Sequence, residues 1–234
     1  AVAGADIADL VAGLEEIGVL SRFAAVLSGY LGTAGAGEAA LAAAAKVRAA
    51  RPSAPYCCDP VMGDRGTGLY VAADLVAFFR DQAVPAADIV VPNHFELEVL
   101  SGRALPSLAD AVAAAARLRR QGPRLVCVSS LSVVELGDSL GTLLLDEGGA
   151  WLVATAHLDI DAKGAGDVLS ALLLAHLLSR KPPAEALERA VASTFAVVQA
   201  TFAAGERELA LVAAQEALVA PPRMFAAEAL NRAG

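Results

Sequence analysis

A glycine-rich turn at the start of an apolar helix holds the first residues that could do chemistry. Residues 161–170 read DAKGAGDVLS, and the apolar run ALLLAHLL follows. Gly164 and Gly166 permit backbone conformations that other residues rarely adopt, so the free N–H groups of the first helical turn can face an anion. Asp167 stands in that turn and could accept a proton from an alcohol. A glycine turn with Asp167 as an ordinary helix-start charge explains these residues about equally well.

Polar side chains also follow two predicted strands. Asp59 lies before Pro60 in the predicted strand YCCDPVM (56–62), and Asp64 lies in the loop that follows this strand. Asn93 and Glu96 follow the stretch DIVVPN. The carboxyl ends of parallel strands share one edge of a sheet, where neighbouring carboxylates repel unless a cation bridges them. Since Mg²⁺ is held by one or two carboxylates plus substrate phosphates, the pattern favours a magnesium–nucleotide site. Taken singly, Asp59 and Asn93 could instead turn the chain beside their prolines.

Strands and helices alternate along most of the chain and must position these residues. Strands are expected over residues 23–32, 56–62, 88–93 and 124–130, and in two further segments around the turn EGG. Residues 63–68 are expected to form a loop. Helices are expected over residues 5–18, 38–50, 72–82, 95–102, 107–122, 166–179, 184–202 and 205–218. The alternation predicts one α/β domain over residues 1–234, a three-layer αβα sandwich around a mainly parallel sheet.

The composition excludes several classes of partner. The net charge of −8 argues against nucleic acid, which needs a basic face. The longest apolar run is too short to span a bilayer and contains Ser170 and His176. Cys57, Cys58 and Cys127 have no zinc-binding spacing and are expected to be buried in a reducing compartment. We therefore expect a cytoplasmic protein with neither a nucleic-acid nor a membrane partner.

The common nucleotide-binding motifs are absent from the sequence. Neither G-x-x-x-x-G-K-[ST] nor G-x-G-x-x-G occurs, and the glycine-rich stretches GTAGAG (32–37) and GDRGTG (63–68) have other spacings. A phosphoryl-transfer enzyme with this sequence would therefore need a different anion-binding site.

The motifs together resemble a known family. GAGD at a helix start, after N-x-x-E at a strand end, is similar to the ribokinase superfamily of small-molecule kinases. Within it, VLSGYLG, YCCDPVMGDRGTGLYV, ADIVVPNHFELEVLSG and ELALVAAQEAL closely resemble the pyridoxal kinases, in order, from Val26 to Leu218. The resemblance implies a homodimeric, ribokinase-like enzyme that uses ATP to phosphorylate the 5′-hydroxymethyl group of pyridoxal, pyridoxine or pyridoxamine.

The resemblance also implies roles for individual residues. Asp167 corresponds to the catalytic base beside the substrate, and Gly164, Ala165 and Gly166 correspond to the anion hole. Residues around the ATP phosphates and Mg²⁺, often with K⁺ or Na⁺ nearby, correspond to Asp59, Asp64, Asn93 and Glu96. Ser129, Ser130 and Tyr70 correspond to nucleotide contacts, and Tyr30 to an aromatic residue beside the vitamin ring.

Two departures and two alternatives accompany this interpretation. The family usually begins with a further strand–loop–helix region, so we expect the chain as given to lack N-terminal strands. The segment DAK before GAGD is also shorter than in the family. The alternatives are a hydroxymethylpyrimidine kinase or other kinase of the superfamily, and a non-catalytic homologue that binds nucleotide or vitamin. DPVMGD with LYV and ELALVAAQEAL favours pyridoxal kinase over the first alternative.

Overall fold

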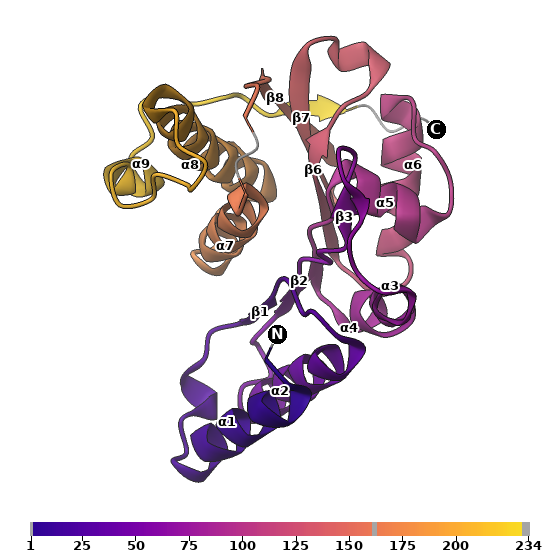
Figure 1. Cartoon of the computed structure of the whole chain (residues 1–234), viewed down its shortest axis with the longest axis vertical. Helices are drawn as coiled ribbons and strands as arrows, with labels where there is room; N and C mark the ends of the chain where they lie inside the picture. The colour runs from indigo at the N-terminus through magenta and orange to yellow at the C-terminus, as the bar shows by residue number, and fades with distance from the viewer. Residues whose placement is uncertain (1, 161–162, 231–234) are drawn as a thin grey trace. The chain divides into compact units, whose positions relative to one another are not determined.

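The computed structural model describes residues 2–160 and 163–230 (Figure 1). Within them, a seven-stranded sheet has the strand order β1-β2-β5-β6-β7-β8-β9. Its strands are β1 (Val26–Ser28), β2 (Tyr56–Cys58), β5 (Ile89–Val90), β6 (Leu125–Leu131), β7 (Ser139–Leu145), β8 (Ala150–Ala156) and β9 (Glu228–Leu230). β1, β2, β5 and β6 pair in parallel, whereas β7, β8 and β9 pair antiparallel. The pairing and the alternating helices confirm the predicted α/β class.

Helices connect most of these strands. They are α1 (Gly4–Glu16), α2 (Ala34–Ala50), α3 (Ala73–Phe78), α4 (Val84–Ala86), α5 (His94–Ser101), α6 (Leu108–Arg119), α7 (Ala165–Leu178), α8 (Pro183–Ala204) and α9 (Gln215–Val219). The described residues fall into two compact units: unit 1 is Ala1–Arg103 with Ala116–Val126, and unit 2 is Ala104–Ala115 with Cys127–Gly234. Among the described helices, none combines the length and apolarity needed to cross a bilayer.

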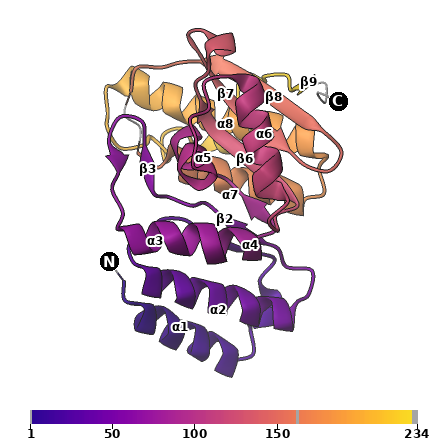
Figure 2. The same cartoon turned by 90° about the vertical axis from the view of Figure 1, so that its right-hand side faces the viewer.

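Unit 1 is built around short, buried strands. All three residues of β2 are buried, as expected for a strand covered on both faces. The alanine-rich helix α2 begins at Thr33, whose Oγ1 atom accepts a hydrogen bond from the Ala36 N–H. Helices α1, α2 and α3 lie side by side (Figure 2). Small residues permit this packing, because a Cβ atom at Gly37 would overlap the ring of Phe78.

Two predictions for unit 1 were wrong in detail. The helix expected over 72–82 is α3 followed by a π-helical turn, Phe79–Ala83, which leads into α4. The adjacent rings of Phe78 and Phe79 are both buried, in edge-to-face contact at 5.8 Å. Residues 63–68, expected to be a loop, begin an antiparallel hairpin of β3 (Gly63–Asp64) and β4 (Gly68–Leu69).

Unit 2 contains the antiparallel strands β7 and β8 and the packed helices α7 and α8. The turn predicted at EGG is confirmed: Asp146 Oδ1 accepts hydrogen bonds from the N–H groups of Gly148 and Gly149. The helix expected over 205–218 was wrong, because α8 ends at the left-handed Gly205 and, up to residue 230, only α9 is helical beyond it. Strand β9 was not predicted.

Candidate active site

Two groups of predicted site residues lie on different units. The acidic cluster, defined as Asp59, Asp64, Asn93 and Glu96, belongs to unit 1. The glycine turn, defined as Gly164, Ala165, Gly166 and Asp167, belongs to unit 2. The two groups differ in burial: Asp59 and Glu96 are buried, whereas Asp167 is exposed.

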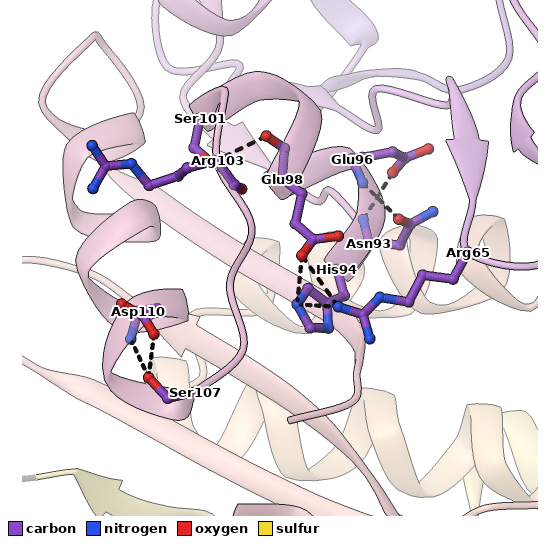
Figure 3. Close-up of polar contacts among 9 residues, drawn as sticks. All are labelled: Arg65, Asn93, His94, Glu96, Glu98, Ser101, Arg103, Ser107 and Asp110. Atoms are coloured by element: carbon purple, nitrogen blue, oxygen red, sulfur yellow. Dashed lines mark hydrogen bonds and ion pairs between the residues drawn. The ribbon is translucent and has the colours of Figure 1, made fainter. Parts of the chain in front are cut away.

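Asn93 and Glu96 form the start of α5. The Asn93 side chain accepts a hydrogen bond from the Glu96 N–H at 2.9 Å, and Glu96 Oε2 accepts one from the Asn93 N–H at 2.8 Å (Figure 3). This reciprocal capping box satisfies two N–H groups that a helix start leaves unpaired. The helix ends at Gly102 in the left-handed conformation, as the sequence predicts.

Glu96 also reaches the segment after Asp59. Its Oε1 atom accepts hydrogen bonds from the N–H groups of Met62 at 2.8 Å and Gly63 at 3.5 Å. The Asn93 side-chain amide donates to the Gly63 carbonyl at 2.8 Å. Asn93 and Glu96 therefore fix the backbone of the DPVMGD stretch as well as their own helix.

The surroundings of the Glu96 carboxyl group disfavour a negative charge on it. Burial and, to a smaller degree, the negative charge of Asp59 raise the pKa of Glu96 to about 8, although the backbone N–H groups of Asn93, Met62 and Gly63 act to lower it. Asp59 is itself only 5% exposed and Glu96 2% exposed. A cation beside these oxygens would relieve the repulsion between the two carboxylates, so the pair suits Mg²⁺ chemically.

The structure also contains a pair of hydroxyl groups, of Ser28 and Tyr56, that the sequence did not predict. The Asp59 N–H donates to the Ser28 carbonyl at 2.8 Å, and the Ser28 and Tyr56 hydroxyls are 2.8 Å apart. Burial raises the pKa of Tyr56 above its usual range and that of Cys58 to about 12, so both stay protonated at neutral pH. No local sequence signal links Ser28 to Tyr56, because their contact forms only when β1 pairs with β2.

Asp64 shapes the turn of the β3–β4 hairpin. Its Oδ1 atom accepts from the Thr67 N–H at 2.7 Å, and its Oδ2 atom from the Thr67 hydroxyl at 3.3 Å. Tyr70 follows β4, is 45% exposed, and donates its N–H to the Met62 carbonyl. The hairpin thus brings Asp64 and Tyr70 onto one short element rooted at Met62.

The glycine turn opens helix α7. Gly164 precedes the helix with φ +89°, a left-handed conformation that side chains disfavour, as predicted. Gly166 was expected to need the same freedom, but this was wrong: it lies inside α7 and has ordinary helical geometry. Asp167 lies in the first turn, and its Oδ2 atom is 3.9 Å from where a Cβ atom of residue 164 would stand.

A second segment runs beside this turn. Lys163 forms an isolated parallel bridge with Glu208, and a Cβ atom at Gly164 would contact the Leu209 side chain at 3.5 Å. Thr201 supports this segment, because its Oγ1 atom accepts from the Ala210 N–H at 3.0 Å. The segment DAK, expected to be short, covers residues 161–163, of which only Lys163 is among the described residues.

The remaining predicted residues lie at strand ends. Ser129 is buried near the end of β6, and Ser130 is exposed with φ +50°, which is uncommon for a residue other than glycine. Such conformations cluster at functional sites. Tyr30 follows β1 and is 62% exposed. The aromatic ring of Tyr30 is therefore available to a flat ligand.

Known proteins resemble the chain over nearly its whole length. The family model for phosphomethylpyrimidine kinase matches residues 21–211. The pyridoxal kinase PdxY of Rubrobacter xylanophilus is 46% identical over 226 residues, covering 96% of this chain and 78% of that protein. The PdxY of Granulibacter bethesdensis is 45% identical over 230 residues, covering 96% and 80%. The structure of Leishmania donovani pyridoxal kinase with ADP and pyridoxamine has a TM-score of 0.87 at 28% identity, covering 97% and 81%.

These matches favour the pyridoxal kinase interpretation over the alternatives that the sequence motifs left open. The predicted ribokinase-like α/β architecture agrees with the Leishmania structure. With relatives above 40% identity across most of its length, the chain belongs to the pyridoxal kinase family.

Proposed function

We propose that this chain transfers the γ-phosphoryl group of ATP to the 5′-hydroxymethyl group of pyridoxal, giving ADP and pyridoxal 5′-phosphate. The observation that carries the proposal is the left-handed Gly164 at the start of α7 with Asp167 exposed in the first turn. Family membership supplies the substrate class, since the relatives are named pyridoxal kinases and the Leishmania enzyme is solved with ADP and pyridoxamine.

In this proposal the glycine turn performs the chemical step. Asp167 accepts the proton of the substrate hydroxyl, whose oxygen then forms a bond to the γ-phosphorus while the bond to ADP breaks. The N–H groups at Gly164, Ala165 and Gly166 hold the oxygens of the moving phosphoryl group. An alcohol is a weak nucleophile, so positioning and charge neutralisation must supply most of the rate.

The acidic cluster is assigned to the ATP phosphates and to Mg²⁺. Asp59, Asp64 and Glu96 supply the carboxylate oxygens, and Asn93 supports them. Mg²⁺, when bound, neutralises charge on the phosphate oxygens. Within the described residues, no three His, Cys, Asp or Glu side chains form a metal-binding group of their own. The proposed ion therefore relies on water and phosphate oxygens for the rest of its coordination, as Mg²⁺ usually does.

Other assignments follow from the family and from exposure. Ser129, Ser130 and Tyr70 are assigned to the nucleotide, with K⁺ or Na⁺ near its phosphates, and Tyr30 is assigned to the vitamin ring. A cytoplasmic location is consistent with the three buried cysteines, which form no disulfide with one another. We also propose a homodimer, which sedimentation or light scattering of the purified protein would test.

We further propose that both units act as one kinase domain. The family match from residue 21 to residue 211 includes residues of both units, which supports this assignment. If the two units had separate functions, one unit by itself would bind ATP with the same affinity as the whole chain. Calorimetry can measure both affinities.

The experiment is ATP-dependent formation of pyridoxal 5′-phosphate by the full chain, with and without EDTA. Hydroxymethylpyrimidine is offered in competition, because the matching family model is described as phosphomethylpyrimidine kinase. We expect turnover of pyridoxal that EDTA abolishes. Faster turnover of hydroxymethylpyrimidine would reassign the substrate. ATP binding without turnover of either compound would favour a non-catalytic binder.

A further inference from the structure

The β3–β4 hairpin carries two of the residues assigned to ATP but has little structure of its own. Each strand has two residues, and a two-stranded hairpin is marginally stable by itself in water. Asp64 lies on β3 and Tyr70 follows β4. Something outside the hairpin must therefore hold these two side chains in place for the reaction.

The root of the hairpin is fixed by α5 and its cap. Glu96 accepts from the N–H groups of Met62 and Gly63, and the Asn93 amide donates to the Gly63 carbonyl. The fit is close, because a Cβ atom at Gly63 would lie 2.6 Å from the Phe95 ring. These contacts act on residues 62–63 and leave the turn of the hairpin to other partners.

The turn is fixed to the next part of α5 by Arg65. Its Nη2 atom lies 3.1 Å from His94 Nε2 and 3.2 Å from Glu98 Oε1 (Figure 3). The guanidinium group has no acceptor, so it donates in both contacts and His94 Nε2 accepts. His94 is 1% exposed and the Glu98 side chain 20% exposed, whereas the Arg65 side chain is 48% exposed. A half-exposed guanidinium group thus contacts a buried imidazole ring.

We propose that Arg65 is a positioning residue for ATP, acting through His94 and Glu98 to hold the β3–β4 hairpin. This inference rests on the proposed function, since it assigns Asp64 and Tyr70 to the nucleotide. Arg65 directly follows Asp64, so motion of the turn displaces that carboxylate. Loss of the contact is expected to weaken ATP binding while the chemistry at Asp167 continues.

The first test does not depend on catalysis. Hydrogen exchange is measured at the Thr67 and Tyr70 amides, which bond to Asp64 and to the Met62 carbonyl. In Arg65→Ala both amides should exchange about tenfold faster than in the wild type. The matched control is Arg80→Ala, which removes another exposed ion pair of unit 1, with Asp81, and should leave both amides unchanged. Equal exchange in Arg65→Ala and the wild type would overturn the inference.

The second test separates positioning from general damage. Arg65→Ala should raise KM for ATP about fivefold, with kcat within twofold and KM for pyridoxal unchanged. In a Glu98→Ala background the same substitution should add less than half of this effect, because the charged one of its two partners is already gone. Arg65→Lys keeps the positive charge but not the planar guanidinium group with its several donors. The rise in KM for ATP should therefore be smaller in Arg65→Lys than in Arg65→Ala.

The outcomes distinguish the two proposals. Faster exchange without a change in KM for ATP would overturn the positioning role, and so would an equal fall in kcat and kcat/KM. A wild-type protein that binds no ATP would overturn the proposed function and the role toward ATP together, whereas one that binds ATP without phosphorylating pyridoxal would overturn the proposed function alone. Hydrogen exchange would still decide in that case whether Arg65 holds the hairpin.

Discussion

The acidic cluster and the glycine turn are built in opposite ways. Glu96 is 2% exposed and accepts three backbone hydrogen bonds, so its carboxylate is already committed to structure. Asp167 is exposed in the first turn of α7, behind a glycine that presents no side chain. Two carboxyl groups of the acidic cluster in unit 1 are therefore buried, whereas the Asp167 carboxylate of unit 2 is open to solvent.

This difference separates stability from activity. Substitutions in the acidic cluster remove hydrogen bonds that the folded chain needs, whereas substitutions at Asp167 remove a group that the fold hardly uses. Each prediction below tests one side of this contrast, and they run from the largest expected effect to the smallest.

The largest effect is expected for Asp167→Asn. The amide cannot accept the hydroxyl proton, so kcat should fall on the order of a thousandfold. Because Asp167 is exposed, the free energy of unfolding should stay within about 0.5 kcal/mol of the wild type. Initial rates and urea unfolding measure the two quantities, with Asp74→Asn in the first turn of α3 as the control. A matching loss of stability would remove the contrast between the two regions.

Glu96→Ala should destabilise the fold. The substitution leaves the buried N–H groups of Met62 and Gly63 and the half-buried N–H of Asn93 without their acceptor, which should cost about 2–4 kcal/mol. Urea unfolding checks this value against Glu16→Ala, which removes an exposed carboxylate at the end of α1. An unchanged urea midpoint in Glu96→Ala would mean that its hydrogen bonds carry no net stability.

The two glycines of the turn should respond differently to alanine. Gly164→Ala forces a side chain into a left-handed conformation and should destabilise folding by about 1–2 kcal/mol. Gly166→Ala lies within helix α7, where alanine is favoured, and should stabilise folding by up to about 1 kcal/mol. Thermal unfolding of both variants makes the comparison. Equal destabilisation by the two substitutions would contradict the helical placement of Gly166.

A smaller effect is expected from His176, in the last turn of α7. Burial and the charges of Arg189 and Lys181 lower its pKa, and its buried Nε2 atom has no hydrogen-bond partner among the described residues. The folded state therefore favours neutral imidazole. This contribution to stability is present above the unfolded pKa of about 6.5 and is lost as pH falls through the lower folded value. Urea midpoints measured from pH 7.5 down to 5.5 should fall less in His176→Leu than in the wild type.

Local signals made several features predictable from the sequence. Gly102 marks a helix end, and the helix expected over residues 95–102 starts within one residue of α5; the capping-box spacing of Asn93 and Glu96 is a further local signal for this start. The alternation of apolar strands with helices predicted the α/β class. Gly164 was identified because glycine alone adopts its backbone conformation easily.

Features that depend on distant contacts were not predictable. The β3–β4 hairpin is held largely by side chains of α5, and its two-residue strands have no alternating pattern. Alanine-rich residues after 205 favoured a helix, yet Gly205 ends α8 and Thr201 binds the Ala210 N–H in a turn. Gly205 was the local signal in this stretch that could have predicted the end of a helix. The Ser28–Tyr56 contact needs two strands to pair first.

The buried cysteines give each unit its own reporter of opening. Cys57 and Cys58 lie on β2 in unit 1, and Cys127 lies on β6 in unit 2, all with no exposed surface. A thiol reagent can reach them only when the strand leaves the core, so the labelling rate of each cysteine measures a local unfolding equilibrium. Mass spectrometry of the labelled peptides would therefore follow local opening in each of the two units separately, within one sample of the unmodified sequence.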